Sequence, residues 1–271
     1  MNKSLVVGSG AMYGAYGAGV TAELGRQLGS KYFDSIYASS VGVFAGTYFS
    51  ADQSRIMEEI WRRHIDGRKL INYFRIRNSL NLRYLENIFR EGHSLLDIEE
   101  VFRSRTRLIY VLTRLRDGKA VYQTPTPLNI FRSMRASAAT PILHNAVHLG
   151  DEYFIDGAFS DPLPVAKALE DGAQFVVAVN NKRADFEIPR SFYILGMLCK
   201  FFSRSVSQLV NDYEIRVRKS EEALQNRRVI VIRPSERLPL RSSVDTDAGR
   251  LNATIDLGIK DARVALEKLP R

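Results

Sequence analysis

The chain has 271 residues, 45% of them hydrophobic and 25% charged, a composition typical of a globular protein with a substantial core. Lysine and arginine (39) outnumber aspartate and glutamate (30), so the formal net charge of +9 should attract polyanions such as nucleic acid, anionic lipid headgroups or an acidic partner. The basic residues are scattered, without zinc-finger spacing or an RNP-type aromatic signature, which argues against a dedicated nucleic-acid-binding module. The single cysteine, Cys199, rules out an internal disulfide and favours a reducing compartment.

We expect no targeting or membrane-spanning segment. The amino terminus, MNKSLVVGSG, has too few apolar residues for a signal peptide. The longest apolar stretch, residues 191–202, contains Gly196 and Lys200 and falls short of the roughly 20 residues that span a bilayer. These features predict a cytoplasmic protein, and the basic surface is compatible with peripheral contact with an anionic membrane.

Short apolar runs alternate with helical patterns along the chain. The runs predict strands at residues 4–7, 34–39, 107–115, 119–125, 146–156 (two short strands around a turn), 174–180 and 228–234. A glycine-rich turn that begins at residue 8 is predicted to run into a helix that continues to residue 29. Further helices are predicted at residues 41–50, 128–138, 162–172 and 248–269, with a helical basic insert at about 52–103 and a helical segment at about 188–225. The repeated units predict an α/β layered fold with a mostly parallel sheet. Because the chain has no internal repeat or linker, we expect one domain over residues 1–271.

The turn after the second predicted strand, in SIYASSVGVFAG (residues 35–46), is a candidate nucleophile elbow. In open α/β sheets, reactive groups lie where a strand ends and a helix begins. An elbow holds its serine in a strained turn and needs small residues two positions before and two after it. Ala38 and Gly42 meet this need for Ser40, whereas Ser39 as nucleophile would put Val41 at a tight position. We therefore predict Ser40 as the nucleophile, with plain packing of the turn as the alternative.

A serine nucleophile needs a base, and the usual histidine is not in the expected order. All four histidines precede the most suggestive acid, Asp156, so the α/β-hydrolase order of serine, acid and histidine fails with that acid. An aspartate can serve directly if it touches the hydroxyl, because its ordinary pKa near 3.9 makes position decisive. Asp156 ends a predicted strand and precedes Gly157, which allows close backbone approach. The alternative is an ordinary turn aspartate in an Asp-Gly pair.

The glycine-rich loop at residues 8–14, GSGAMYG, predicts an anion-binding site. Successive backbone N–H groups that lead into a helix N-terminus form a concavity suited to the oxyanion of acyl transfer. A dinucleotide-binding loop is the rival interpretation. Its G-x-G-x-x-G spacing is not met, since Gly8, Gly10 and Gly14 are spaced G-x-G-x-x-x-G, and Asp34 precedes its strand instead of ending it.

The glycine-rich loop, the serine elbow and a third block together resemble the patatin-like phospholipases. The third block, residues 134–179, is the most specific. It has an Arg-Ala-Ser helix, a proline, a short hairpin, Asp-Gly-Ala, Asp-Pro-Leu-Pro-Val and a buried strand. The similarity covers nearly the whole chain up to residue 180 and is greatest to a bacterial branch with a helical basic insert after the elbow helix.

The resemblance implies a three-layer α/β/α sandwich and lipid acyl hydrolysis by a Ser-Asp dyad, with no metal or organic cofactor. Ser40 would be the nucleophile and Asp156 the proton acceptor. Backbone amides of the glycine-rich loop would hold the oxyanion, at Ser9, Gly10, Ala11 and Met12. The supporting positions of the three motifs are Gly14, Ala38, Gly42, Gly157 and Ala158. The implied partner is a lipid or ester substrate.

Two departures from the family pattern leave a second function open. The loop is usually Gly-Gly-Gly-x-Arg-Gly, and Tyr13 stands here at the arginine position. Ala38 stands at the first glycine of the elbow. Loss of a cation beside the loop could weaken catalysis or change headgroup preference. The alternative is therefore a catalytically weak or inactive patatin-like protein that binds lipid or a partner.

The segment SFYILGMLCKFFSRSVSQLV, residues 191–210, bears on the choice of substrate. Its aromatic residues accompany Lys200 and Arg204, so the segment could cover an acyl-chain cleft or rest on an anionic membrane. A lid or core helix with ordinary snorkelling cations is the alternative. The basic surface favours phospholipid as the substrate.

Overall fold

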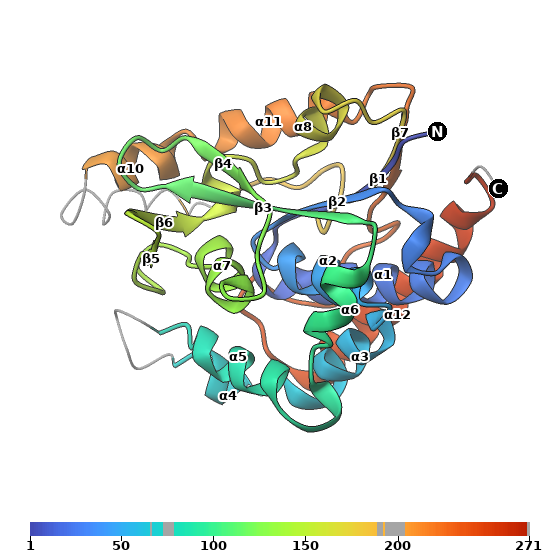
Figure 1. Cartoon of the computed structure of the whole chain (residues 1–271), viewed down its shortest axis with the longest axis horizontal. Helices are drawn as coiled ribbons and strands as arrows, with labels where there is room; N and C mark the ends of the chain where they lie inside the picture. Colours follow the sequence, from blue (N-terminus) through green and yellow to red (C-terminus); the bar gives the residue numbers. More distant parts are fainter. Residues whose placement is uncertain (66, 73–78, 189–191, 193–203, 270–271) are drawn as a thin grey trace.

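The computed structural model describes residues 1–65, 67–72, 79–188, 192 and 204–269, and these are built around an eight-stranded sheet (Figure 1). The strands are β1 (Lys3–Val7), β2 (Ser35–Ser39), β3 (Arg107–Arg114), β4 (Ala120–Gln123), β5 (Val147–Leu149), β6 (Glu152–Asp156), β7 (Phe175–Val179) and β8 (Val229–Ile232). Their order is β5-β6-β3-β2-β1-β7-β8, and β4 also pairs with β3. Each strand overlaps a segment predicted from the apolar runs, so those predictions are confirmed.

The strands β3-β2-β1-β7-β8 run parallel, and β4, β5 and β6 add antiparallel pairs at one side of the sheet. Strands β1, β2 and β7 are buried almost throughout, as expected of parallel strands that helices cover on both faces. The antiparallel strands belong to two hairpins, and Gly118, with a φ of 67°, allows the tight turn between β3 and β4. The sheet is therefore mixed, with the parallel core that the sequence predicts.

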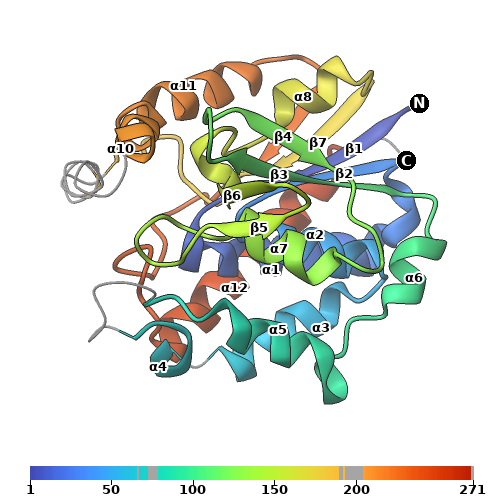
Figure 2. The ribbon, with the colours of Figure 1, turned by 60° about the vertical axis from the view of Figure 1, so that its left-hand side comes forward.

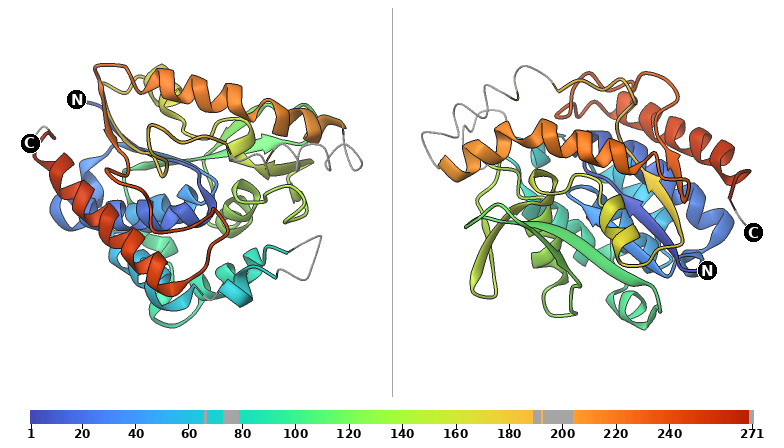
Figure 3. Two further views of the ribbon diagram at one scale, coloured as in Figure 1. Left: turned by 180° about the vertical axis from the view of Figure 1, so that it is seen from behind. Right: turned by 90° about the horizontal axis from the view of Figure 1, so that it is seen from above.

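Helices cover both faces of the sheet, which confirms the three-layer α/β/α sandwich (Figures 1 and 2). Over one face lie α8 (Val165–Glu170) and α11 (Tyr213–Ala223), and over the other lie α1 (Gly14–Leu28), α2 (Gly42–Ser50) and α12 (Ala248–Leu266). Figure 3 shows α12 packed along α1 and α11 running above the strands. Two apolar cores result: Tyr37 and Val176 share one with α8, and Leu5 and Ile36 share the other with α1 and α2.

The basic insert lies on the far side of α1 and α2 from the sheet (Figure 2). Its described part consists of α3 (Ser54–Glu59), the π-helical turn η3 (Ile60–His64), α4 (Gly67–Leu70), α5 (Leu82–Arg90), the one-turn helix η4 (Gly92–Ser94) and α6 (Ile98–Arg103). The ring centre of Phe89 on α5 lies 5.3 Å from that of Phe44 and 5.5 Å from that of Tyr48, both on α2. The insert therefore buries apolar surface against the helix that begins at the predicted elbow.

The remaining described helices are α7 (Ile130–Ser137), α10 (Arg204–Asn211) and the one-turn helices η1 (Ala11–Tyr13), η2 (Ser30–Tyr32) and η5 (Gly157–Phe159). None of the helices in the described ranges combines the length and the apolar character needed to cross a bilayer. Most of the segment at residues 191–210 lies outside the described residues, and so do Cys199 and Lys200.

Candidate active site

Two strands end next to each other along one edge of β3. Val111 of β3 pairs with Ser39 of β2 on one side and with β4 on the other. The next residue, Leu112, pairs with Asp156 of β6 and again with β4. Since β4 occupies one edge of β3 at both positions, β2 and β6 must share the other edge. The last residue of β2 and the last residue of β6 are therefore neighbours, although their strands run in opposite directions.

The chain turns away from β3 immediately after Asp156. A Cβ atom on Gly157 would overlap the carbonyl oxygen of Val111, so the close backbone approach predicted at this position requires glycine. Thr113 Oγ1 donates a 2.8 Å hydrogen bond to the carbonyl oxygen of Asp156. The start of η5 is thus fixed against β3, and the Asp156 side chain projects from a rigid strand end.

Ser40 occupies a tight turn between β2 and α2. Its φ of 56° lies in the left-handed region, which residues other than glycine rarely adopt. A Cβ atom on Gly42 would overlap the Val7 carbonyl oxygen, so α2 can begin this close to β1 only with glycine there. Ala38 is fully buried, and the Ser40 amide donates a 3.0 Å hydrogen bond to Ser137 Oγ. The turn therefore has the strained serine and the small flanking residues that an elbow needs.

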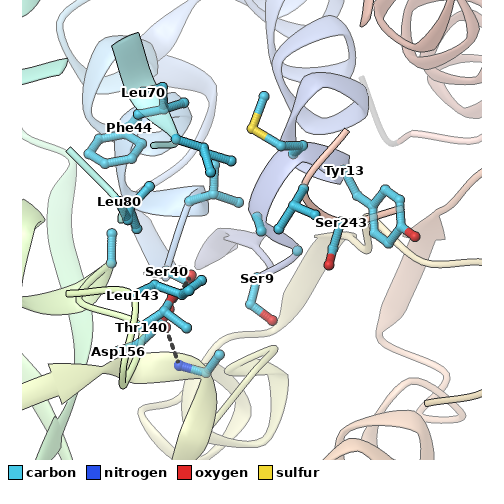
Figure 4. A pocket seen from close by; sticks show the side chains of 18 of the residues that line it. Ser9, Tyr13, Ser40, Phe44, Leu70, Leu80, Thr140, Leu143, Asp156 and Ser243 are labelled. Atoms are coloured by element: carbon cyan, nitrogen blue, oxygen red, sulfur yellow. Dashed lines mark hydrogen bonds between the residues drawn. The ribbon is translucent and has the colours of Figure 1, made fainter. Parts of the chain in front are cut away.

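The Ser40 hydroxyl donates a 2.9 Å hydrogen bond to Asp156 Oδ2. Thr140 Oγ1 donates to the same oxygen at 2.8 Å, and the Ala158 amide donates to Asp156 Oδ1 at 2.9 Å. Figure 4 shows Ser40, Thr140 and Asp156 close together at one side of a pocket. The carboxylate is thus held in one orientation, with Oδ2 directed at the serine hydroxyl.

The Asp156 carboxyl is buried, with 3% of the residue exposed, and this burial raises its pKa to about 6. Hydrogen bonds from the Ala158 amide and from the Thr140 and Ser40 hydroxyls oppose the rise, and so does the positive charge of Lys182. The carboxylate form prevails above that pH. A base with this pKa matches neutral conditions better than an ordinary aspartate does.

The glycine-rich loop contains both bonded and unbonded amides. The Ser9 amide donates at 2.9 Å to a carbonyl in the η5–α8 connection, and the Met12 amide donates at 3.0 Å to a carbonyl in the β8–α12 connection. No described residue accepts a hydrogen bond from the amide of Gly10 or Ala11. Both of these residues line the same pocket as Ser40. Of the four residues predicted to hold an oxyanion, Gly10 and Ala11 are therefore the two whose N–H groups are available to a ligand.

Asn181, the second residue after β7, holds the loop from one side. Its Nδ2 donates to the carbonyl oxygens of Gly8, at 2.8 Å, and Ser9, at 3.2 Å. The residue is 1% exposed, and its Oδ1 has no hydrogen-bond partner among the described residues. At the other end of the loop, Gly14 begins α1 and lies against Val41 of the elbow. Loop and elbow are therefore packed next to each other.

A cavity of about 540 Å³ opens beside Ser40 and Asp156. One part of it is lined by apolar side chains of α2 and the insert, among them Phe44, Met57, Trp61, Leu70, Leu85 and Phe89. Figure 4 shows Phe44, Leu70 and Leu80 grouped on one side of the pocket. This part offers a hydrocarbon chain an apolar environment directly next to the serine hydroxyl.

Another part of the same cavity is lined by aromatic and cationic side chains. Tyr13 contacts Phe186 edge-on, with 6.3 Å between the ring centres, and Figure 4 shows Tyr13 and Ser243 across from the apolar group. Burial raises the pKa of Tyr13, so the residue at the arginine position of the resembling family is a neutral phenol. Lys182 and Arg241 also line the cavity. Positive charge at the site therefore comes from segments other than the glycine-rich loop.

Four residues of the site were missed by the sequence analysis: Ser137, Thr140, Asn181 and Lys182. Ser137 and Thr140 lie in the recognised block at residues 134–179, where hydroxyls between small residues are a weak signal. Asn181 and Lys182 come just after a buried parallel strand. Polar residues at the carboxyl end of such a strand are a known mark of sites in open α/β sheets, and this signal could have identified both.

None of the four histidines, His64, His93, His144 and His148, lines the cavity. Within the described residues there is also no group of three or more His, Cys, Asp or Glu side chains that could hold a metal ion. Asp34 precedes β2, and its carboxylate accepts a 2.7 Å hydrogen bond from the Lys3 amide at the amino end of β1. It is therefore at the opposite end of the strand from the glycine-rich loop, where it cannot serve a dinucleotide.

Comparison with known proteins identifies the family. A curated relative, "Uncharacterized protein YjjU" of Escherichia coli (strain K12), is 26% identical over 219 residues; the match covers 77% of this chain and 59% of the relative, less than two-thirds of its length. The crystal structure of VipD from Legionella pneumophila is similar in fold, with a TM-score of 0.60 at 12% identity, covering 98% of this chain and 66% of that chain. The family model described as "Patatin-like phospholipase" matches residues 5–169, and the chain belongs to this family.

Proposed function

We propose that this protein is a serine acyl hydrolase of lipids, with Ser40 as the nucleophile and Asp156 as the general base. The observation that carries the proposal is the 2.9 Å hydrogen bond from the Ser40 hydroxyl to a buried carboxylate, beside a largely apolar cavity. Membership of the patatin-like phospholipase family supports lipid hydrolysis in general. The particular dyad and the oxyanion site are our assignments.

In the proposed reaction, Asp156 Oδ2 accepts the hydroxyl proton as Ser40 Oγ attacks the ester carbonyl carbon. The amides of Gly10 and Ala11 donate to the oxyanion of the tetrahedral intermediate. Collapse of this intermediate breaks the ester C–O bond, and the proton on Asp156 passes to the leaving alkoxide. Water then attacks the acyl-serine and gives a proton to Asp156. Collapse of this second tetrahedral intermediate releases the carboxylic acid, and the proton on Asp156 returns to Ser40 Oγ.

The apolar part of the cavity supports a long-chain acyl group as the part of the substrate next to the ester. Burial of a hydrocarbon chain contributes about 0.8 kcal/mol per CH₂ group. Phe44 at the first turn of α2 and Leu85 of the insert line this part, so the insert would contact the chain directly. Under this proposal the insert binds the acyl chain of the substrate in addition to covering α2.

Labelling with a fluorophosphonate probe tests the proposal. We expect wild-type protein to be labelled covalently and Ser40→Ala to show no labelling, because the probe reacts only with an activated serine. Ser39→Ala is the matched control: Ser39 is the adjacent residue, and its hydroxyl donates to the Asp161 carbonyl at 2.8 Å instead of to a base. Labelling of Ser40→Ala at the wild-type rate, with folded protein verified by circular dichroism, would exclude Ser40 as the nucleophile.

The pH dependence of kcat/KM should show an acid limb near pH 6, because activity requires the ionised form of Asp156 and burial raises its pKa to about 6. Activity should fall as the pH drops through this value. Thr140→Val removes a hydrogen bond to Oδ2 that favours the carboxylate, so the limb should move to higher pH by about 0.5 to 1 unit. The profile is measured with a soluble ester between pH 4.5 and 9.

Thr113→Val is the control for this shift, because Thr113 bonds the backbone carbonyl of Asp156 and not its carboxylate. The shift in Thr140→Val also separates two acids, since burial raises the pKa of Asp161 to about 6 as well. Asp161 is held by the Tyr122 hydroxyl, at 2.8 Å, and Thr140 does not bond it. An acid limb that stays in place in Thr140→Val would assign the titration to a group other than Asp156.

The second candidate function, lipid or partner binding without catalysis, is motivated by Tyr13 at the arginine position of the loop. It predicts an unreactive serine on an intact scaffold. The fluorophosphonate experiment therefore distinguishes the two functions: absence of labelling in folded wild-type protein would favour binding alone. The direct bond between Ser40 and Asp156 supports the catalytic alternative.

A further inference from the structure

We infer that Ser137 is a positioning residue for Ser40: its hydroxyl keeps the Ser40 amide out of the β2–β3 ladder and so holds the nucleophile in its strained turn. The inference rests on the proposed function, because it assigns a role in the same reaction. It starts from two hydrogen bonds of one side chain. Ser137 Oγ accepts from the Ser40 amide at 3.0 Å and donates to the Val111 carbonyl oxygen at 2.7 Å. Ser137 is 0% exposed, so both bonds lie in the interior of the protein.

The two partners of Ser137 are the groups that one more step of the parallel ladder would join. Ser39, the last residue of β2, pairs with Val111 of β3, and the ladder between the two strands ends at this pair. The Ser40 amide is the next one along the chain. Because one hydroxyl bonds both this amide and the Val111 carbonyl, the two groups face each other across the same gap. In a continued parallel ladder they would bond directly, and here the Ser137 hydroxyl stands between them.

The Val111 carbonyl also fixes the segment that carries the proposed base. A Cβ atom on Gly157 would lie 2.1 Å from this carbonyl oxygen, so the residue after Asp156 packs directly against it. By bonding the same oxygen, the Ser137 hydroxyl is placed relative to Asp156 as well as to Ser40. One carbonyl of β3 therefore relates the turn of the nucleophile to the strand end of the base.

The end of α7 holds Ser137 rigidly. Ser137 is the last residue of this helix, and the nearby Ala136 and Ala139 are both 0% exposed in an apolar cluster with Leu112 of β3 and Phe154 of β6. The Asp156 amide donates a 3.0 Å hydrogen bond to the Ala139 carbonyl oxygen. Because packing and a backbone bond fix the segment on both sides of its side chain, the Ser137 hydroxyl is a fixed point against which the Ser40 turn is placed.

Without the hydroxyl, two buried backbone groups would lose their partner, which costs free energy. The Ser40 amide and the Val111 carbonyl can pair with each other only if Ser40 moves toward β3 and extends β2 by one residue. This movement would also relieve strain, because Ser40 has a left-handed φ of 56°. It would take the Ser40 hydroxyl away from Asp156 Oδ2, to which it now donates at 2.9 Å. Ser137 therefore opposes a relaxation that would separate the nucleophile from its base.

Kinetics of Ser137→Ala test the inference. We expect kcat and the rate of fluorophosphonate labelling to fall about 100-fold, with a change in KM of less than about threefold, because the reacting groups are misplaced and the cavity is intact. The acid limb of kcat/KM should also move to higher pH by about 0.5 unit, since the lost bond from the Ser40 hydroxyl favours the carboxylate form of Asp156. A general loss of stability would not move this limb, and Ser137 itself does not touch the carboxylate.

Ser133→Ala is the matched control. Ser133 lies one turn earlier on α7 and is also 0% exposed, but its hydroxyl donates at 3.3 Å to Asn129 Oδ1, and the residue does not line the cavity. This variant should keep the wild-type kcat and the wild-type acid limb. Ser137→Cys is measured in parallel, so that the test stands if Ser137→Ala fails to fold. Cysteine keeps the side-chain shape and bonds weakly, so its kcat should fall between those of wild type and Ser137→Ala.

Crystal structures of wild type and Ser137→Ala test the inference without turnover. We expect a direct bond from the Ser40 amide to the Val111 carbonyl in the variant, and no bond from the Ser40 hydroxyl to Asp156. A Ser40 φ that stays near 56° with the hydroxyl on Asp156, or a wild-type kcat in Ser137→Ala, would overturn the inference. Failure of the proposed function is seen separately, as the absence of fluorophosphonate labelling in wild-type protein. A displaced Ser40 in the variant of such an unlabelled protein would still support Ser137 as the residue that sets the turn.

Discussion

Replacing Asp156 with asparagine is expected to lower kcat/KM by about 10³-fold and, at pH 8, to raise the free energy of unfolding. The loss of activity follows from the loss of the base, because Asp156 Oδ2 is the atom that receives the Ser40 proton in the proposed reaction. General-base catalysis is typically worth 10²- to 10⁴-fold. The nearest histidines cannot substitute for it, since none of them lines the cavity.

The gain in stability follows from the pKa of the buried carboxyl. Burial raises this pKa from 3.8 to about 6 in the folded protein, so the folded state binds the proton more tightly than the unfolded chain does. Wild-type stability therefore falls as the pH rises from about 4 to about 6, and the full penalty of the buried charge is present above pH 6. A two-unit shift corresponds to about 3 kcal/mol, and we expect asparagine to recover about 1 to 3 kcal/mol of it.

The hydrogen bonds around Asp156 can accommodate the amide of the Asp156→Asn variant. The carbonyl oxygen of the new side chain would accept from the Ala158 amide, and its NH₂ group would donate to the hydroxyls of Ser40 and Thr140, which both rotate freely enough to accept. Urea unfolding of both proteins at pH 5 and pH 8 measures the effect. The stability difference should be about half as large at pH 5 as at pH 8, because pH 5 lies midway between the pKa of the unfolded chain, 3.8, and that of the folded protein, about 6.

Asp161→Asn is the control that separates stability from activity. Burial raises the pKa of Asp161 to about 6 as well, but its carboxylate bonds Tyr122 and not Ser40. This variant should also gain stability at pH 8, yet keep most of its activity. An Asp156→Asn protein that is less stable than wild type at pH 8 would contradict the prediction. It would mean that hydrogen bonds and nearby positive charge stabilise the Asp156 carboxylate more than burial destabilises it.

The sequence was sufficient to place Ser40 and Asp156 at the ends of two strands, because apolar runs and small residues mark those positions locally. It did not indicate why they touch. Their contact depends on an antiparallel strand, β6, that continues along the same edge of β3 where the parallel strand β2 stops. Neither apolar periodicity nor a turn signal reports which edge a strand takes, since this depends on the packing of the whole sheet.

The glycine-rich loop shows the same limit at the scale of single atoms. The family resemblance implies an oxyanion site at Ser9 to Met12, around Gly10 and Ala11, but the sequence does not show which of these amides are bonded elsewhere. The amides of Ser9 and Met12 are bonded by the carbonyls of Pro162 and Ser243, which are contributed by distant connections in the chain. A backbone donor is available only if no other segment reaches it, and this is a property of the tertiary structure.

Asn181→Ala is expected to lower kcat by about 100-fold while changing KM by less than about threefold. The side chain donates to the Ser9 carbonyl at 3.2 Å. In a trans peptide the C=O and the following N–H point in opposite directions, so this bond turns the Gly10 N–H away from Asn181. Gly10 lines the cavity and Asn181 does not, which leaves the amide available to the oxyanion. Loss of one oxyanion donor costs about 10²- to 10³-fold.

A fall in kcat with little change in KM distinguishes loss of the oriented Gly10 amide from a general loss of protein stability. Asn181 does not line the cavity, so ground-state binding should be kept, and only the charge that develops in the transition state should lose its partner. Thr254→Val is the matched control, because it removes a buried 2.8 Å hydrogen bond within α12, away from the site. Steady-state kinetics and the rate of fluorophosphonate labelling are measured for both variants. A kcat equal to that of Thr254→Val would mean that the loop keeps its orientation without Asn181, and the Gly10 amide would then be held by the turn of the chain itself.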